Sequence, residues 1–78
     1  METEELLYKI VTHLVDNPEA VHLNKIEGEQ NSILELSVAK EDIGKVIGKK
    51  GRTANAIRNI LSAASAKLNK RTILEILE

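Results

Sequence analysis

Apolar residues recur through the first part of the chain at the spacing of an amphipathic helix. They fall at positions 6, 7, 10, 11, 14 and 15, which places them on one face of a helix with 3.6 residues per turn. Glutamates precede this stripe, where a helix N-terminus favours negative charge, and Asp16-Asn17-Pro18 follows it. The pattern predicts a first helix over residues 3–16.

The next two segments alternate apolar and polar residues, as half-buried strands do. The alternation runs through residues 20–26 and again through residues 33–38, and a period of two gives each strand one buried face. The inward residues are expected to be Val21, Leu23, Leu34, Leu36 and Val38. Glycine and asparagine in the intervening residues 27–31 are typical of a turn. These segments therefore predict a β-hairpin.

The last part of the chain predicts two helices and a strand. Apolar residues at 43, 46 and 47 indicate a short helix that ends at Gly48, and those at 57, 60, 61, 64 and 68 indicate a longer one over residues 52–68. Residues 71–77 alternate as a strand. The two helices form a crossover between strands two and three, which favours a parallel, right-handed return. The sequence predicts one α+β domain over residues 1–78, in the order α-β-β-α-α-β, with a three-stranded mixed sheet and helices on one face.

The composition supports an aliphatic core and excludes several kinds of chemistry. The chain has nine Ile, ten Leu and five Val but no Phe, Trp or Cys, so it has neither disulfides nor thiolate metal ligands. No Ser-His-acid arrangement, cleft carboxylate pair or metal-ligand cluster is evident, and we expect no enzyme, cofactor or metal. The first residues lack a secretory signal, and no apolar run approaches the ~20 residues needed to cross a bilayer. We expect a cytoplasmic protein without a membrane segment.

Charge is strongly segregated, although the net charge is only −1. Residues 1–39 carry a charge of −6, residues 40–71 carry +7, and residues 72–78 carry −2. Such asymmetry indicates a local anion-binding face on a protein whose acidic remainder limits indiscriminate binding to polyanions.

The centre of the basic part is a glycine-bounded turn between the two predicted helices. Residues 43–58 contain three of the four glycines and five Lys or Arg, with no acid among them. Glycines let a backbone approach another chain closely, and the helix that follows directs free N–H groups at the turn. A nucleotide-binding P-loop does not fit, because three residues separate Gly44 from Gly48 where that motif has four, and Lys49 precedes Lys50 instead of Ser or Thr.

The turn resembles the signature of the KH domain, V-I-G-x-x-G-x-x-I. Val46-Ile47-Gly48-Lys49-Lys50-Gly51 matches its first part, whereas Ala54 stands where the family has its last apolar residue and Ile57 follows one helical turn later. The predicted element order is that of the type II KH fold, so the resemblance covers the whole chain. Within that family, the length and composition are similar to those of small bacterial stand-alone KH proteins.

The resemblance implies a protein that binds single-stranded RNA, or single-stranded DNA, and clamps the backbone of about four nucleotides with the Gly-Lys-Lys-Gly turn. It implies a groove with walls on the short helix, the turn, the start of the long helix and the last strand. The residues carried over onto these walls are Ile43, Gly44, Ile47, Gly48, Lys49, Lys50, Gly51, Arg52, Thr53, Asn55, Arg71, Thr72 and Ile73. Phosphates are expected at the turn and bases on aliphatic side chains, because no aromatic platform lies near.

The resemblance also implies association and a role in RNA regulation. It predicts a homodimer, or a heterodimer with a larger RNA-binding partner, and strand alternation makes Ile33 with Ile73 or Leu77 a candidate contact. A post-transcriptional regulator or RNA chaperone fits this picture. The alternative is a protein-interaction or ribosome-assembly adaptor in which the groove is used little.

Overall fold

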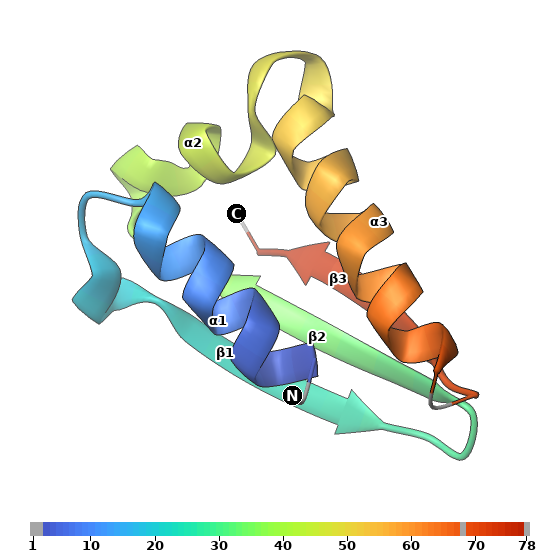
Figure 1. Ribbon diagram of the computed structural model, residues 1–78. Helices are drawn as coiled ribbons and strands as arrows, with labels where there is room; N and C mark the ends of the chain where they lie inside the picture. Colours follow the sequence, from blue (N-terminus) through green and yellow to red (C-terminus); the bar gives the residue numbers. More distant parts are fainter. Residues whose placement is uncertain (1–2, 68, 78) are drawn as a thin grey trace.

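The protein contains three helices and a three-stranded sheet in the predicted order (Figure 1). The structure is a computed structural model, which describes residues 3–67 and 69–77. The elements are α1 (Thr3–Leu14), β1 (His22–Glu27), β2 (Asn31–Ser37), α2 (Ile43–Ile47), α3 (Arg52–Ala66) and β3 (Arg71–Ile76). Short 3₁₀ turns cover Pro18–Ala20, Lys40–Asp42 and Lys49–Gly51. The α+β class and the element order of the type II KH fold are confirmed.

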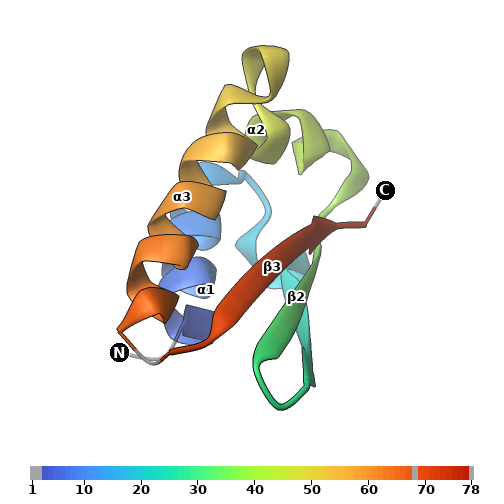
Figure 2. The ribbon, with the colours of Figure 1, turned by 90° about the vertical axis from the view of Figure 1, so that its right-hand side faces the viewer.

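The sheet has the mixed topology that the crossover predicted. Its strand order is β1-β2-β3, with β1 antiparallel to β2 and β2 parallel to β3. The helices cover one face of this sheet, as the two ribbon views show (Figures 1 and 2). On the opposite face the register aligns Ile26, Ile33 and Ile73 in one row across the three strands.

The core lies between the helices and the inner face of the sheet. Its largest fully buried apolar side chains come from α1, β2, α2 and α3: Leu7, Val11, Leu34, Leu36, Val46 and Leu61. Each contributes about 1.5–3 kcal/mol relative to an exposed side chain. Ile57, 2% exposed, also belongs to this core. Nowhere in residues 3–67 and 69–77 is a helix long and apolar enough to span a membrane.

The first helix ends earlier than its apolar pattern predicted. It stops at Leu14, and the amide N–H groups of Asp16 and Asn17 donate to the carboxylate of Asp42, at 3.2 and 3.0 Å. These bonds compete with further helical ones, so the chain leaves the helix there. The next strand begins at His22 because Pro18–Ala20 forms a 3₁₀ turn. The long helix ends at Ala66, and its predicted end at residue 68 lies outside the described residues.

Candidate nucleic-acid interface

The turn between α2 and α3 contains a glycine whose backbone leaves no room for a Cβ. Gly48 ends α2 with φ +76° and donates its N–H to the carbonyl of Gly44 at 2.8 Å. A Cβ at Gly48 would lie 2.8 Å from the backbone nitrogen of Thr53 and still closer to its side chain. The first turn of α3 therefore folds back against Gly48, which fixes the turn to the start of that helix.

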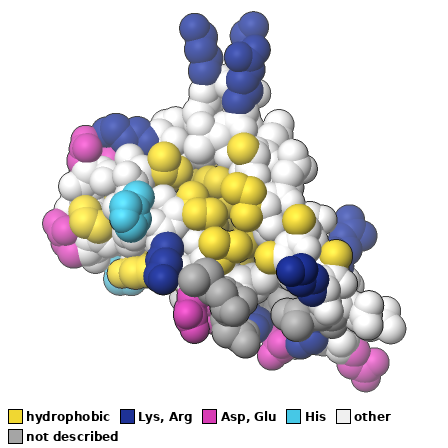
Figure 3. Space-filling model, viewed as in Figure 1, with side chains coloured by type: hydrophobic (Ala, Val, Ile, Leu, Met, Phe, Trp, Pro, Cys, Tyr) yellow, Lys and Arg dark blue, Asp and Glu magenta, His cyan; other side chains and the backbone are white. Residues whose placement is uncertain are grey.

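The next residues of the turn also have unusual backbone angles. Lys50 and Gly51 both have left-handed backbones, with φ +58° and +75°. For Lys50 this conformation costs roughly 1–2 kcal/mol, because its Cβ crowds the following carbonyl. Such strain is characteristic of functional sites. In Figure 3 basic side chains project from the end of the molecule where Figure 1 places this turn.

The cations of the turn are exposed and have no acidic partner within the described chain. Lys49, Lys50 and Arg52 are exposed, and none forms an ion pair with another residue in the parts that the structure describes. Because α3 begins at Arg52, the positive end of a 15-residue helix lies beside them. Charge and helix dipole thus act at one place, which suits a phosphate, while the N–H groups of Gly51 and Arg52 donate to the carbonyls of Gly48 and Lys49 within the turn.

Lys45 belongs to the same basic stretch of sequence but has a different environment. Its ammonium lies 2.5 Å from Asp16 and 3.5 Å from the fully buried Asp42. The hydrogen bond to Asp16 is the main cause of a raised pKa for Lys45. Asp42 stands at the N-terminus of α2 but makes no capping bond there, since its carboxylate accepts the amides of Asp16 and Asn17. This network fastens α2 to the end of α1, and with it the entry to the turn.

The outward surface of α2 is bare at Gly44. Nothing lies within 4 Å of the position that a Cβ would take, so the packing of the chain does not require a glycine there. Glycine inside a helix costs roughly 0.5–1 kcal/mol relative to alanine. Ile43 and Ile47 beside it are half-buried. Open backbone flanked by aliphatic side chains gives another molecule close access to α2.

Two hollows lie along β3. One, of about 280 Å³, lies between α3 and the start of β3, and its lining residues are Arg58, Asn59, Ser62, Arg71, Thr72, Ile73 and Leu74. The other, of about 680 Å³, lies where the chain leaves β3 and approaches α2; Ser37, Val38, Lys40, Ile43 and Leu77 line it. Figure 2 shows β3 running from the end of α3 toward α2; the smaller hollow lies by the start of this strand and the larger one just past its end.

The backbone of β3 offers hydrogen-bonding groups at this edge. The N–H groups of Arg71 and Leu77 donate to Gln30 and Leu36, on the β2 side. Because backbone groups alternate along a parallel strand, those of Thr72, Leu74 and Ile76 point to the free edge.

The structure groups the predicted site residues into two sets. The members on α2, the turn and the first turn of α3 adjoin one another in the chain and in space (Figure 1). Arg71, Thr72 and Ile73 lie by the other end of α3, about 20 Å away at 1.5 Å per helical residue. Sequence reasoning did not assign Arg58, Asn59 and Ser62 to the site, although their spacing on the polar face of α3 was a signal. Arg58 also reaches the side chain of Asn55, at 3.4 Å.

Comparison with known proteins places the chain in a family. Residues 4–76 match the family model described as "KhpA/KhpB, KH domain". The chain is 56% identical over 73 residues to the "RNA-binding protein KhpA" of Caldanaerobacter subterraneus subsp. tengcongensis, covering 94% of this chain and 97% of that protein. It is 53% identical over 74 residues to the protein of the same name from Clostridium perfringens, covering 95% and 99%.

Similarity of structure extends to a much more distant protein. A crystallised variant of Aquifex aeolicus Era bound to GDP·AlF4⁻ superposes with a TM-score of 0.64 at 19% identity, over 95% of this chain and 29% of that one. At this identity the match concerns the fold alone. The family model and the full-length matches agree with the Gly-Lys-Lys-Gly turn and the α-β-β-α-α-β order. The chain therefore belongs to the KhpA/KhpB family of KH domains.

Proposed function

We propose that the protein binds single-stranded RNA, holding about four nucleotides along α2, the turn and β3. The observation that carries the proposal is the set of exposed, unpaired cations at the turn, Lys49, Lys50 and Arg52, at the N-terminus of α3. The matched relatives are named RNA-binding proteins, which supports the same reading.

In this proposal the phosphates bind at the turn. The Lys50 side chain is exposed on a left-handed backbone, and a Cβ at Gly51 would meet only the side chain of Asn55, at 4.0 Å, so the surface beside the start of α3 is open. Neither lysine contacts a base, so the turn provides affinity and register without reading sequence. Gly44 lets the strand pass close to α2.

The bases lie toward β3. Ile43 and Ile47 provide an aliphatic surface, and the free edge of β3 provides the backbone donors and acceptors that recognise base edges. Arg71, Thr72 and Ile73 contact the strand where it reaches the hollow against α3, and Arg58 adds a cation there. With no aromatic platform, affinity per module is modest.

The proposed role is that of a post-transcriptional regulator or RNA chaperone of the cytoplasm, acting by binding and not by catalysis. Single-stranded DNA is the competing ligand, because a phosphate clamp accepts both backbones.

A salt titration tests this function. RNA affinity, measured by fluorescence anisotropy, is expected to fall as salt rises, with a log–log slope of about −2 for three neutralised phosphates. A single-stranded DNA of the same sequence serves as the comparison. A protein with no measurable RNA affinity at low salt would refute the proposal and favour the adaptor alternative.

We also propose that the protein acts as a homodimer, or as a heterodimer with a larger RNA-binding protein of the KhpB type. Two linked sites raise the effective concentration of one RNA at the second site. The row Ile26, Ile33 and Ile73 supports this, because it forms an apolar strip on the uncovered face of the sheet, with Ile26 48% and Ile73 36% exposed.

Sedimentation of two variants locates the contact. Ile33→Glu is expected to give monomers, whereas Ile60→Glu, at a 46% exposed position of α3, is the control and is expected to leave the dimer intact. Dissociation by Ile60→Glu alone would move the contact to the helices. A parent protein that is monomeric at micromolar concentrations would exclude self-association.

A further inference from the structure

The larger of the two hollows along β3 has a mostly aliphatic lining with one charged residue. Its volume is about 680 Å³, and the residues that line it are Ser37, Val38, Lys40, Ile43 and Leu77. Three of the five are aliphatic, and Lys40 is the one that carries a charge. Clefts of this size are typical of sites for small organic groups. This hollow is called the Lys40 hollow below.

The aliphatic side chains of the Lys40 hollow are open to another molecule. Leu77 is 45% exposed, although its N–H donates to the carbonyl of Leu36 at 2.8 Å and so holds its backbone beside β2. Val38 and Ile43 are half-buried, and Val38 packs against the core. A ligand with an apolar face would remove the exposed part of these side chains from water. The lining therefore favours such a ligand.

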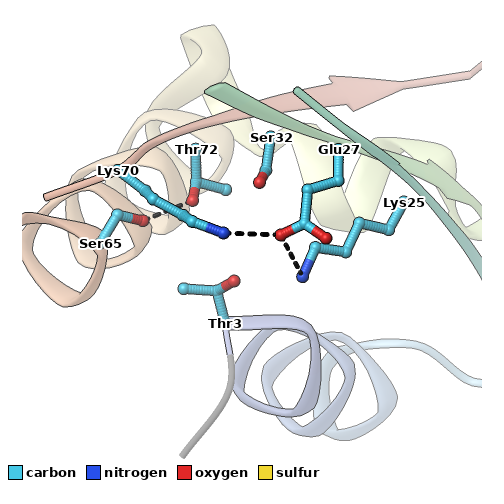
Figure 4. Close-up of a pocket in the computed structure, with 7 residues that line it drawn as sticks. All are labelled: Thr3, Lys25, Glu27, Ser32, Ser65, Lys70 and Thr72. Atoms are coloured by element: carbon cyan, nitrogen blue, oxygen red, sulfur yellow. Dashed lines mark hydrogen bonds and ion pairs between the residues drawn. The ribbon is translucent and has the colours of Figure 1, made fainter. Parts of the chain in front are cut away.

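Lys40 gives the hollow a positive charge that the protein does not neutralise. Lys40 is exposed and forms no ion pair or side-chain hydrogen bond within the described residues, and no acid is among the residues that line the hollow. The polar pocket in Figure 4 differs, because Lys70 and Lys25 both approach the carboxylate of Glu27 there, at 2.7 and 3.6 Å. The Lys40 hollow thus combines an aliphatic lining with an unpaired cation.

The Lys40 hollow adjoins the surface that is proposed to bind RNA. Ile43 lines the hollow and also belongs to the proposed groove. The next residue is Gly44, where nothing lies within 4 Å of a Cβ position. An RNA strand that passes over this bare backbone reaches the hollow without meeting a side chain at position 44. A nucleotide has the two parts that the hollow fits, since a base has apolar faces and a phosphate is anionic.

We propose that the Lys40 hollow binds a fifth nucleotide of the same RNA, next to the four held along α2, the turn and β3; this inference rests on the proposed function. The base lies against Val38, Ile43 and Leu77, and the ammonium group of Lys40 pairs with the phosphate. The Ser37 hydroxyl adds one hydrogen-bonding group. Because aliphatic side chains do not distinguish base edges, the hollow lengthens the bound RNA segment without adding much sequence preference.

The test compares RNAs that differ by one nucleotide. A four-nucleotide RNA is extended at its 5′ end or at its 3′ end, and the affinity of the full chain is measured by fluorescence anisotropy. One of the two extensions is expected to tighten binding severalfold and to steepen the log–log salt slope by about 0.7, the value for one more neutralised phosphate of a single strand. In NMR titrations, the amides of Val38 and Leu77 are expected to shift with that longer RNA and not with the shorter one.

Two variants and a control assign this gain to the hollow. Lys40→Met is expected to remove the salt-dependent part of the gain. Leu77→Ser is expected to remove the part that requires the base, so that an abasic extension binds this variant as well as a complete nucleotide does. Lys9→Met is the matched control and is expected to keep the full gain, because Lys9 is an exposed lysine of α1 that does not line the hollow.

The outcomes separate this site from the groove. Binding of the four-nucleotide RNA without a gain from either extension, or equal losses of the gain in Lys9→Met and Lys40→Met, would overturn the fifth-nucleotide site and leave the proposed function standing. A protein that binds none of these RNAs at low salt would refute both. Dissociation of a dimer by Leu77→Ser, with the gain from the extension unchanged, would assign the hollow to a protein contact and would also overturn the proposal.

Discussion

The lysines of the turn differ in their partners from three lysines that form ion pairs elsewhere in the fold. Lys49 and Lys50 are exposed and form no ion pair within the described residues, whereas Lys25, Lys45 and Lys70 each lie 2.5–3.2 Å from a carboxylate. A paired lysine has its charge largely neutralised by its own protein. An unpaired cation held outward on a strained backbone retains its charge for a ligand. Lys9, Lys40 and Lys67 are also exposed and form no ion pair within the described residues, so the glycine turn at the start of α3, and not exposure alone, supports the turn as the candidate nucleic-acid site.

The largest effect is expected from Asp42→Ala, which removes a carboxylate from the network that pairs with Lys45. The buried carboxylate accepts two backbone N–H groups and adjoins Lys45, so its removal leaves two partly buried donors without this partner and opens a gap where a fully buried group stood. We expect a loss of about 3 kcal/mol in the free energy of unfolding. Urea unfolding measures it. A variant as stable as the parent would mean that the link between α1 and α2 contributes little.

Two single substitutions compare a paired and an unpaired lysine directly. Lys45→Met is expected to lower stability only slightly, because an exposed ion pair contributes little, and to leave RNA affinity unchanged. Lys50→Asn is expected to weaken RNA binding severalfold at parental stability, since asparagine tolerates the left-handed backbone. Anisotropy and thermal melting are measured for both. If Lys45→Met weakened RNA binding as much as Lys50→Asn, the distinction between the two lysines would fail.

Gly44→Ala separates folding from binding at the edge of the same site. A methyl group enters open space, so stability is expected to rise by about 0.5–1 kcal/mol. RNA affinity is expected to fall, because the methyl group occupies the surface over which the strand passes. Thermal melting measures the change in stability, and fluorescence anisotropy measures the change in RNA affinity. An RNA affinity equal to that of the parent would place the strand away from α2.

The smallest effect is expected at Glu27, whose carboxylate pairs with both Lys25 and Lys70. The hydrogen bond from Lys70, and then the charge of Lys25, lower the pKa of Glu27 below its ordinary value of 4.5. A lowered folded-state pKa stabilises the protein above about pH 4.5, and this contribution is lost as pH falls through the folded-state value. The melting difference between the parent and Glu27→Gln is therefore expected to shrink on acidification and in high salt. A pH-independent difference would contradict the pairing.

Much of the fold was predictable from the sequence because its core is aliphatic and periodic. Leu7, Val11, Leu34, Leu36 and Leu61 are buried where the patterns placed them. The ends of elements were less predictable. The stop of α1 at Leu14 depends on a carboxylate at position 42, far along the chain, and no local pattern contains that contact.

The candidate site, too, was predictable from the sequence only in part. The glycine spacing predicted a sharp turn, and both Gly48 and Gly51 have the positive φ that favours glycine. The pairing of Lys45 with Asp16 and the hollow beside Arg58 depend on how distant segments pack, so charge counting along the chain did not find them. The assignment of individual residues to RNA contact stays a prediction.

The most direct test of the central claim reverses the unpaired charges of the turn while both glycines stay. The variant K49D/K50D is compared with K9D/K67D, which makes the same charge change at two other exposed lysines. Anisotropy at several salt concentrations gives RNA affinity, and circular dichroism checks the fold. We expect the turn variant to bind at least about tenfold more weakly, with a salt slope flatter by roughly one unit, and the control to stay close to the parent. Equal losses in both variants, or parental affinity in a folded turn variant, would contradict the account.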